Sequence, residues 1–189
     1  MAARLPQTAA LLAALREPVF SSAETGGTPE GLRKNLVQAQ HLLGDAGWRF
    51  RDGALRDTEG KAFVITMLIP DRSSEVVLAP YARNLMRLGI TLRYRLSDAS
   101  LIKKRLDDFD FDMAINLLGG STSPGNELYD DLGSASAQEK GSQNLSGIQD
   151  KVVDQLIEEI VNSPDRKTIA AGARLLDRYL RYQQYVVPM

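Results

Sequence analysis

Residues Asp107 to Asn126 read DDFDFDMAINLLGGSTSPGN, and this stretch decides the fold. An acidic turn leads into an apolar run from Met113 to Leu118, which only Asn116 interrupts. Two glycines and a small polar loop, Gly119 to Asn126, then end the run. An apolar run bounded by polar residues in this way predicts a strand buried on both faces of a sheet. Loops at the carboxyl ends of central strands bind small ligands in open α/β sheets, so the stretch predicts binding, not catalysis.

Two further strands are predicted upstream of this stretch. Phe63 to Ile69 is a continuous apolar run ended by proline, and Thr91 to Leu96 alternates with its leucines and tyrosine on one face. A helix is predicted between them over Ser73 to Leu88, and a second helix over Ser97 to Asp107. Strand–helix–strand–helix–strand with short joints builds a parallel sheet through right-handed crossovers.

The segments around these strands complete the predicted fold class. Asp52-Gly53 and Glu59-Gly60 mark the turns of a small hairpin, which makes the sheet mixed although largely parallel. A helix begins at Thr28-Pro29 and ends at Gly47, and the next residue, Trp48, is predicted to be a core anchor, with ligand stacking as the alternative. Two amphipathic helices follow in the last third of the chain. The predicted class is therefore α/β, with a mixed, largely parallel sheet covered by helices.

The domain organisation follows from the linker signals. Residues 1–27 are predicted to be an N-terminal helix and linker, because a leucine-rich segment is followed by SSAETGG over Ser21–Gly27. Residues 28–189 are predicted to form one ligand-binding lobe. The chain's YVVPM end is strand-like and lacks an obvious partner, which suggests a lobe cut from a larger protein.

Composition excludes several functions. The chain has 189 residues, a formal net charge of −1 and no cysteine. The near-neutral charge gives no general attraction to nucleic acid or anionic membranes. Without cysteine there are no disulfides, no thiolate chemistry and few zinc sites. No apolar run reaches the ~20 residues that span a bilayer, and the first residues lack a secretory signal pattern.

Three motifs resemble catalytic or metal-binding signatures but lack required parts. Asp108, Asp110 and Asp112 alternate as in a calcium loop, yet its sixth and twelfth positions are Met113 and Gly119, so a solvated turn is the preferred interpretation. The GGSTS segment lacks the closing glycine of a nucleophile elbow, and the chain has a single histidine. No glycine-rich loop ends in Gly-Lys-Ser/Thr. We therefore expect no enzyme activity, no metal and no cofactor.

The basic residues near the predicted sheet offer no nucleic-acid groove. They are interleaved with acidic residues and lack aromatic partners, as the segments TLRYRLSD and LIKKRLDD show. A solvated face is the preferred interpretation, so no nucleic acid is expected as a partner.

From Leu32 onward the chain resembles the C-terminal lobe of the bacterial family 5 extracellular solute-binding proteins, nearest to the microcin C and oligopeptide-binding branch. Four segments carry the resemblance: LRKNLVQAQHLLGDAGW, DTEGKAFVITMLIP, APYARNLMRLGITLRYRLSD and RLDDFDFDMAINLLGGSTSPGNEL. The segment NLSGIQDKVVDQLIEEIVNSPDR adds the Asn-x-Ser-Gly and Val-Asp-x-Leu-Ile pattern of the family. The resemblance implies one lobe of a type II periplasmic-binding (venus-flytrap) fold.

The resemblance also implies a function and partners. The expected function is binding of an oligopeptide or peptide-like solute for an ABC importer, on the periplasmic or extracellular face. The expected partners are the solute, a missing N-terminal lobe of the same parent chain, and the ABC permease. The alternative is a self-contained α/β interaction or regulatory module without a transport role.

The expected ligand-binding residues lie in and after the loop. They are Leu118, Gly119, Gly120, Ser121, Thr122, Ser123, Asn126 and Asn144. Many peptide binders of the family carry in this loop an aromatic residue and an aspartate that holds the peptide amine. Leu118 and Ser121 stand at those places here.

Overall fold

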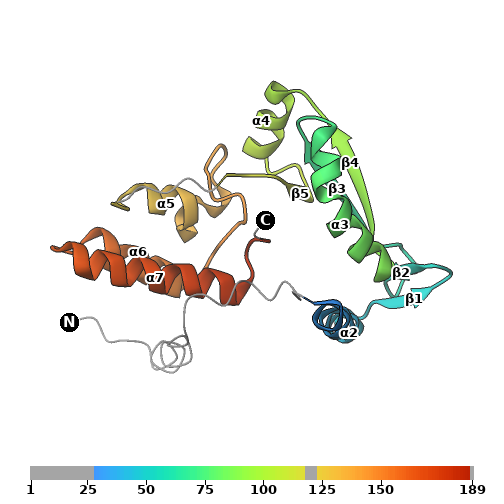
Figure 1. Ribbon diagram of the computed structural model, residues 1–189. Coiled ribbons are helices and arrows are strands. Elements are labelled where there is room, and N and C mark those ends of the chain that lie inside the picture. The colour runs from blue at the N-terminus through green and yellow to red at the C-terminus, as the bar shows by residue number, and fades with distance from the viewer. Residues whose placement is uncertain (1–27, 118–122, 188–189) are drawn as a thin grey trace. The chain divides into compact units, whose positions relative to one another are not determined.

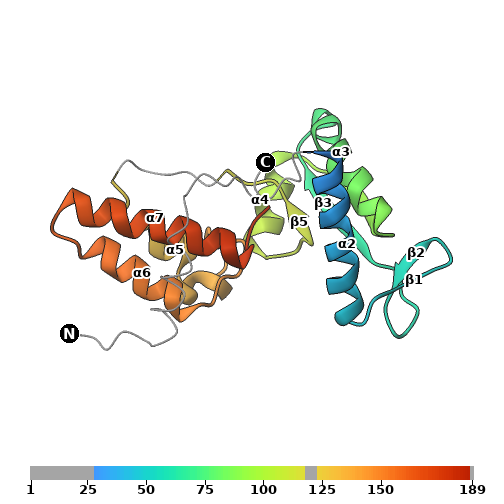
Figure 2. The same cartoon turned by 60° about the horizontal axis from the view of Figure 1, so that its bottom comes forward.

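The computed structural model describes residues 28–117 and 123–187, and its helices and strands are labelled in Figure 1 and seen from a second direction in Figure 2. The described residues fall into two compact units, each described by itself below. We call residues 28–117 the sheet unit and residues 123–187 the helical unit. The N-terminal helix and linker predicted over residues 1–27 lie outside the described residues, and the assignment of residues 28–189 to one lobe stays a prediction.

A three-stranded parallel sheet forms the centre of the sheet unit. Its strands are β3 (Val64–Ile69), β4 (Thr91–Leu96) and β5 (Met113–Ala114), in the order β4-β3-β5. The register pairs Val64 with Thr91 and Met67 with Met113. The predicted β-α-β-α-β topology is thereby confirmed, with α3 (Ser73–Arg87) joining β3 to β4 and α4 (Ala99–Asp107) joining β4 to β5.

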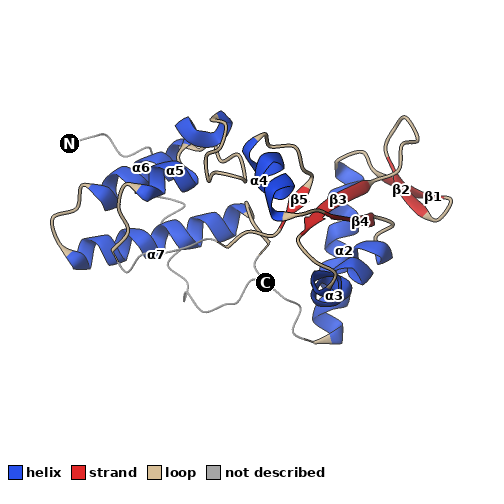
Figure 3. Ribbon diagram, turned by 90° about the horizontal axis from the view of Figure 1, so that it is seen from above, coloured by secondary structure: helices blue, strands red, loops and turns tan. Residues whose placement is uncertain are grey.

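The strand order decides which faces the two connecting helices cover. The chain leaves β3 in one direction to form β4, and then passes β3 in the other direction to form β5. Right-handed crossovers in opposite directions place their helices on opposite faces of a sheet. Figure 3 shows α3 on one side of the strands and α4 on the other.

One part of the strand prediction is wrong. The apolar run from Met113 to Leu118 was expected to be a strand buried on both faces, but of its described residues, 113–117, only Met113–Ala114 pairs, and it forms an edge strand of the sheet. The central strand is β3, whose last three residues are buried. Leu117 is 92% exposed. Hydrophobicity identified a strand here, but the crossover topology decides which strand lies between two neighbours, and no local pattern encodes that.

The hairpin lies beside the parallel sheet as a separate two-stranded sheet. Its strands β1 (Arg49–Arg51) and β2 (Ala54–Arg56) are antiparallel. Asp52 and Gly53 both have positive φ, the conformation that a tight two-residue hairpin turn requires. Leu55 joins the hairpin to the rest of the unit, because its N–H donates to the Gly89 carbonyl at 2.8 Å.

The predicted core role of Trp48 is confirmed. The helix α2 (Pro29–Asp45) begins at the cap Thr28, whose hydroxyl accepts the Gly31 N–H. Just beyond the helix, the Trp48 ring stacks on Phe63 at 4.4 Å between centroids. Both rings pack against the buried residues Leu55, Leu85, Leu88 and Ile90.

The helical unit is built on two long helices joined by a short connection. They are α6 (Lys151–Val161) and α7 (Arg166–Gln183), which lie side by side in Figures 1 and 2 and follow α5 (Glu127–Leu132) and the 3₁₀ helix η1 (Ser134–Gln138). The predicted apolar stripe of α6 is fully buried: Val153, Leu156, Ile157 and Ile160. A Cβ added at Gly172 would lie 2.7 Å from the Ile160 side chain, so glycine allows the close approach of α7 to α6.

A single carboxylate ties together three parts of the helical unit. Asp150 caps α6 by accepting the Val152 N–H at 2.8 Å, and it also accepts the hydroxyls of Tyr179 at 2.6 Å and Tyr185 at 2.9 Å. Burial raises the pKa of Asp150, but these hydrogen bonds outweigh burial and hold the pKa below its ordinary value. The ionised form of Asp150 therefore stabilises the folded helical unit.

We expect the helical unit to lose stability as the pH falls below about 4, the ordinary pKa of an aspartate. A carboxyl whose folded pKa is lowered binds protons more readily in the unfolded chain, so acid favours unfolding. Asp150→Asn should cost about 1–2 kcal/mol at neutral pH and flatten this acid dependence. Urea unfolding at several pH values, followed by amide exchange in α6, measures both effects.

Tyr185→Phe is the matched control for this prediction. It removes one hydroxyl donor and leaves the carboxylate in place, so part of the acid dependence should remain. Burial, together with the bond to Asp150 and its charge, raises the pKa of Tyr185 to about 12. The wild-type unit should therefore also weaken between about pH 10 and 12, and Tyr185→Phe should weaken less there. An unchanged acid profile in Asp150→Asn contradicts the role assigned to this carboxylate.

Candidate functional site

The candidate site is the end of the parallel sheet at which all three strands have their carboxyl ends. β3, β4 and β5 end at Ile69, Leu96 and Ala114, and because all three are parallel their ends lie at the same edge. From β3 the chain crosses to β4 on one side, and from β4 it crosses back past β3 to β5 on the other side. The topological switch point therefore lies between β3 and β5. Ligands of open α/β sheets bind in the crevice outside such a switch point. The sequence predicted only the loop after β5 as a ligand site, whereas the topology adds the loop after β3.

The loop between β3 and α3 consists of Pro70, Asp71 and Arg72, all exposed. The Asp71 carboxylate accepts the Ser74 N–H at 3.1 Å and the Ser73 hydroxyl. The Ser73 hydroxyl is the main cause that lowers the pKa of Asp71, followed by the Ser74 N–H. The Asp71 side chain therefore caps the N-terminus of α3, although the N-cap position itself is occupied by the next residue, Arg72.

The segment after β5 brings an exposed leucine to the same edge. Asn116 and Leu117 follow the strand, and both are exposed. The five predicted site residues that come next lie outside the described residues: Leu118, Gly119, Gly120, Ser121 and Thr122. Their role as ligand contacts remains a prediction.

Two predicted site residues lie at the start of the helical unit. Ser123 is exposed and takes part in an interaction of its own. Asn126 stands at the cap position of α5, is exposed, and makes no side-chain cap bond. The amide of Asn126 is therefore not used to cap its helix.

Asn144 was expected to contact the ligand, but in the structure it has a scaffold role, because its side chain holds parts of the helical unit together. Its side chain is only 1% exposed. The amide nitrogen donates to the carbonyls of Gly133 and Ile148, both at 3.0 Å, and the amide oxygen accepts the Ile148 N–H at 2.9 Å. These bonds use both donors and one acceptor site inside the helical unit. The Asn-x-Ser-Gly pattern drew attention to Asn144, but no local sequence pattern shows that its side chain is buried.

The acidic turn before β5 has structural partners. The Asp112 carboxylate accepts the N–H of Thr66 in β3 at 2.8 Å, and Asp110 forms an ion pair with Arg105. Among the described residues, no group of three His, Cys, Asp or Glu side chains is placed to hold a metal ion. Within the same residues, no helix has the length and hydrophobicity that a membrane span needs.

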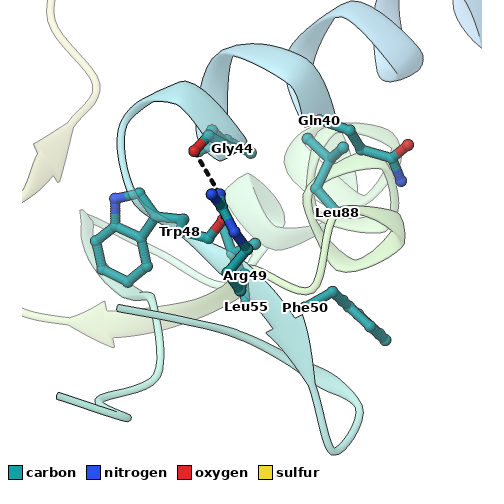
Figure 4. A pocket seen from close by; sticks show the side chains of 8 residues that line it. Gln40, Gly44, Trp48, Arg49, Phe50, Leu55 and Leu88 are labelled. Carbon is teal, nitrogen blue, oxygen red and sulfur yellow. Dashed lines mark hydrogen bonds between the residues drawn. The ribbon is translucent and has the colours of Figure 1, made fainter. Parts of the chain in front are cut away.

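A small pocket lies at the opposite end of the sheet unit, near the amino ends of the strands (Figure 4). It has a volume of about 210 Å³ and is lined by Gln40, Leu43, Gly44, Trp48, Arg49, Phe50, Leu55 and Leu88. The Arg49 guanidinium donates to the carbonyls of Gly44 and Trp48, as a cation that caps the carboxyl end of α2. The pocket is smaller than the ~300–1,000 Å³ of ordinary ligand sites. Arg49 is the only charged residue that lines the pocket, and its guanidinium is hydrogen-bonded at the end of α2. We therefore do not assign a ligand to the pocket.

Comparison with known proteins shows which proteins the chain resembles. No model of a known protein family matches the chain. The chain is 42% identical over 169 residues to the uncharacterized protein y4wM of Sinorhizobium fredii, covering 89% of this chain and 26% of that protein. It is 38% identical over 163 residues to the probable peptide-binding protein YejA of Agrobacterium fabrum, covering 86% of this chain and 26% of that protein.

A solved structure shows the same fold. The oligopeptide-binding protein AppA of Bacillus subtilis, in complex with a nonapeptide, superposes with a TM-score of 0.67 at 23% identity, over 79% of this chain and 30% of that chain. The chain therefore has the fold of one lobe of a type II periplasmic-binding protein. Over most of its length the chain is thus similar to a protein named as a peptide-binding protein, in line with the resemblance to the family 5 extracellular solute-binding proteins. It spans about a quarter of the length of the curated relatives described above.

Proposed function

We propose that the chain supplies one wall of the ligand site in the extracellular solute-binding protein of an ABC importer, and that the solute is an oligopeptide or peptide-like molecule. The observation that carries the proposal is the 38% identity, over 86% of this chain, to a protein named as a peptide-binding protein. The sheet topology supports it independently, because β3 and β5 flank the switch point, and ligands of open α/β sheets bind outside the carboxyl ends of the strands at such a point.

The proposed wall has two contributions. One is the loop predicted from the sequence: Leu118, Gly119, Gly120, Ser121, Thr122, Ser123 and Asn126. The other lies in the sheet unit and consists of the β3–α3 loop and the exposed Asn116 and Leu117, which follow β5. Short side chains and glycines leave backbone N–H and C=O groups accessible, and an extended peptide presents matching groups. We do not include Asn144 in the wall, because its amide is buried and hydrogen-bonded.

The proposed partners follow from the same resemblance. A second lobe of the parent chain closes over the ligand, and the closed receptor delivers the solute to a membrane permease on the periplasmic or extracellular face. Closure between lobes is a hinge motion that buries the ligand against both walls. The proposed role is binding without catalysis, in keeping with relatives that are named as binding proteins.

The 189-residue chain by itself should bind short peptides with a Kd no tighter than about millimolar, equivalent to about −4 kcal/mol. Hydrogen bonds on one open wall are worth only ~0.5–1.5 kcal/mol each, because water competes for the same groups. A few such bonds barely offset the ~4 kcal/mol or more of lost translational and rotational freedom. Calorimetry and NMR titration with a defined tripeptide pool measure this affinity.

The control is the two-lobed parent protein with the same peptides, which should bind far more tightly. Enlarging Ser121 or Thr122 to a bulky side chain should weaken binding by the parent, because both stand in the proposed wall. Micromolar binding by the 189-residue chain alone would show that one lobe carries a complete site, and the one-wall proposal would be abandoned.

A further inference from the structure

Strand β4 is an outer strand of the parallel sheet, and among the described residues its side away from β3 pairs with no other strand. We call this side the β4 edge. Thr91 at the start of β4 and Ser97 directly after it donate their N–H groups toward the β3 segment, at 3.1 and 3.2 Å. Backbone groups alternate from side to side along a strand, so those of Leu92, Tyr94 and Leu96 point outward. The β4 edge thus offers unpaired N–H and C=O groups at three residues.

The side chains of β4 give this edge two different faces. Leu92 and Tyr94 lie on the face that α3 covers, because they pack in one cluster with Leu78 of α3. Arg93 and Arg95 lie on the opposite face and are exposed. Neither guanidinium takes part in the hydrogen bonds or ion pairs found within the described residues. One face of the β4 edge is therefore largely apolar, and the other carries two unpaired cations.

The flank of α3 beside the β4 edge is also largely apolar. Burial raises the pKa of Tyr94 and the negative charge of Glu75 raises it further, so Glu75 lies on the flank of α3 toward β4. Ala79, Ala82 and Met86 follow Glu75 at intervals of four, three and four residues, which places them on the same stripe of the helix. Met86 is 68% exposed. A strand added beside β4 can therefore place apolar side chains against this stripe.

The two arginines select the kind of strand that can be added. A second copy of β4 would bring Arg93 and Arg95 of one chain opposite the same arginines of the other, and like charges in such positions destabilise a pair of strands. Charged side chains on outer strands commonly prevent self-pairing in this way. A strand with carboxylates on this face gains attractive cross-strand pairs instead. The charges therefore disfavour a second copy and favour an acidic strand.

We propose that the β4 edge binds an extended acidic segment of a partner protein, in which carboxylate side chains alternate with apolar ones. The segment adds a fourth strand to the three-stranded sheet, its apolar side chains lie against α3, and its carboxylates pair with Arg93 and Arg95. Strand addition takes affinity from main-chain hydrogen bonds and specificity from alternate side chains. The inference does not depend on the proposed function, because the switch point lies between β3 and β5, on the other side of β3.

The test is an NMR titration of the ¹⁵N-labelled 189-residue chain at low ionic strength with three capped peptides. The acidic probe is acetyl-Thr-Val-Glu-Val-Glu-Val-Thr-amide, and its glutamates are replaced by glutamine in the second probe and by lysine in the third. The acidic probe should bind about three- to tenfold more tightly than the lysine probe, with the glutamine probe between them. The amide protons of Leu92, Tyr94 and Leu96 should move downfield as they gain hydrogen bonds. Those of Arg93 and Arg95, which already face β3, should move less.

Two further probes test whether binding is strand pairing. In one, the acidic probe is methylated on the backbone nitrogens of both glutamates, and in the other on those of the three valines. Only one of these two sets of N–H groups can face β4, because they alternate along an extended chain. One methylated probe should therefore retain binding, and the other should lose it. Equal behaviour of the two probes overturns the proposed strand addition.

Variants assign the charge preference to the two arginines. Arg93→Glu/Arg95→Glu should reverse the preference, and tighter binding of the lysine probe shows that this variant is folded. Arg83→Glu/Arg87→Glu is the matched control, because both residues are exposed on α3 and the change in net charge is the same. The control should keep the preference for the acidic probe. An unchanged preference in Arg93→Glu/Arg95→Glu, or a reversed one in the control, overturns the inference.

Other occupants of the β4 edge give different results. If a second copy fills it, the amides of Leu92, Tyr94 and Leu96 shift when the peptide-free chain is diluted. If another segment of the same chain fills it, these amides exchange slowly before any probe is added. Either result overturns the inference, as does the absence of shifts at these amides with the acidic probe. Shifts confined to residues 70–74 and 115–117 also overturn it, and they support the proposed function instead.

Discussion

Asn144→Ala should destabilise the helical unit by about 2–4 kcal/mol, because it leaves buried backbone groups without partners. The wild-type amide bonds the carbonyls of Gly133 and Ile148 and the N–H of Ile148. Alanine can neither donate nor accept, and the space around the 1%-exposed side chain cannot supply water without rearrangement. A shift in the urea midpoint of amide exchange at Ile148 and in α6 measures the loss.

Asn126→Ala is the matched control for Asn144→Ala. Asn126 is exposed and makes no side-chain cap bond, so its replacement should change stability by less than about 0.5 kcal/mol. The two asparagines were expected from the sequence to share a role, and this pair of variants separates them. Lowered ligand affinity in Asn144→Ala at unchanged stability would restore Asn144 to the ligand wall and contradict the scaffold role.

Gly89→Ala should destabilise the sheet unit by about 2–4 kcal/mol, the sum of backbone strain and a steric clash. Gly89 has φ +79°, and an added Cβ would lie 2.7 Å from the backbone nitrogen of Leu55 and from the Phe50 ring. The Gly89 carbonyl also accepts the Leu55 N–H, so separating the two segments breaks that hydrogen bond. Trp48 is the single tryptophan and stacks on Phe63 in this unit, so its fluorescence during urea unfolding reports the change.

Gly53→Ala isolates the strain from the clash. Gly53 has a similar φ, +77°, but nothing lies within 4 Å of its added Cβ. It should therefore cost only about 1 kcal/mol, the strain of a left-handed backbone. Equal losses in the two variants would show that the close approach of Gly89 to the hairpin contributes nothing to stability.

Local sequence patterns were sufficient for most secondary structure. The apolar run before Pro70 predicted β3, the alternation from Thr91 to Leu96 predicted β4 with its observed bounds, and the stripe in α6 is buried as expected. Strand and helix periods place side chains on fixed faces, so burial leaves a trace in the sequence. Caps such as Thr28 were also predictable, because a short polar side chain satisfies the free N–H groups at a helix start.

The candidate site could be predicted only in part. The small polar loop after β5 stands out in the sequence because glycines and short side chains follow an apolar run. The β3–α3 loop carries no such signal, and Pro-Asp-Arg there is indistinguishable from any polar turn. What brings it to the site is the pairing of β3 with β5, between segments some 46 residues apart, as the bond from the Thr66 N–H to Asp112 illustrates.

The periodic patterns of this chain establish an α/β protein with parallel strands, and its segments from Leu32 onward indicate the family. Tertiary structure alone decides that β3 is the central strand, that the run after Met113 reaches an exposed edge at Leu117, and that Asn144 points inward. The physical reason is the range of the interactions. Periodicity and caps act over three or four residues, whereas strand order and the burial of a polar side chain depend on contacts between segments that only folding brings together.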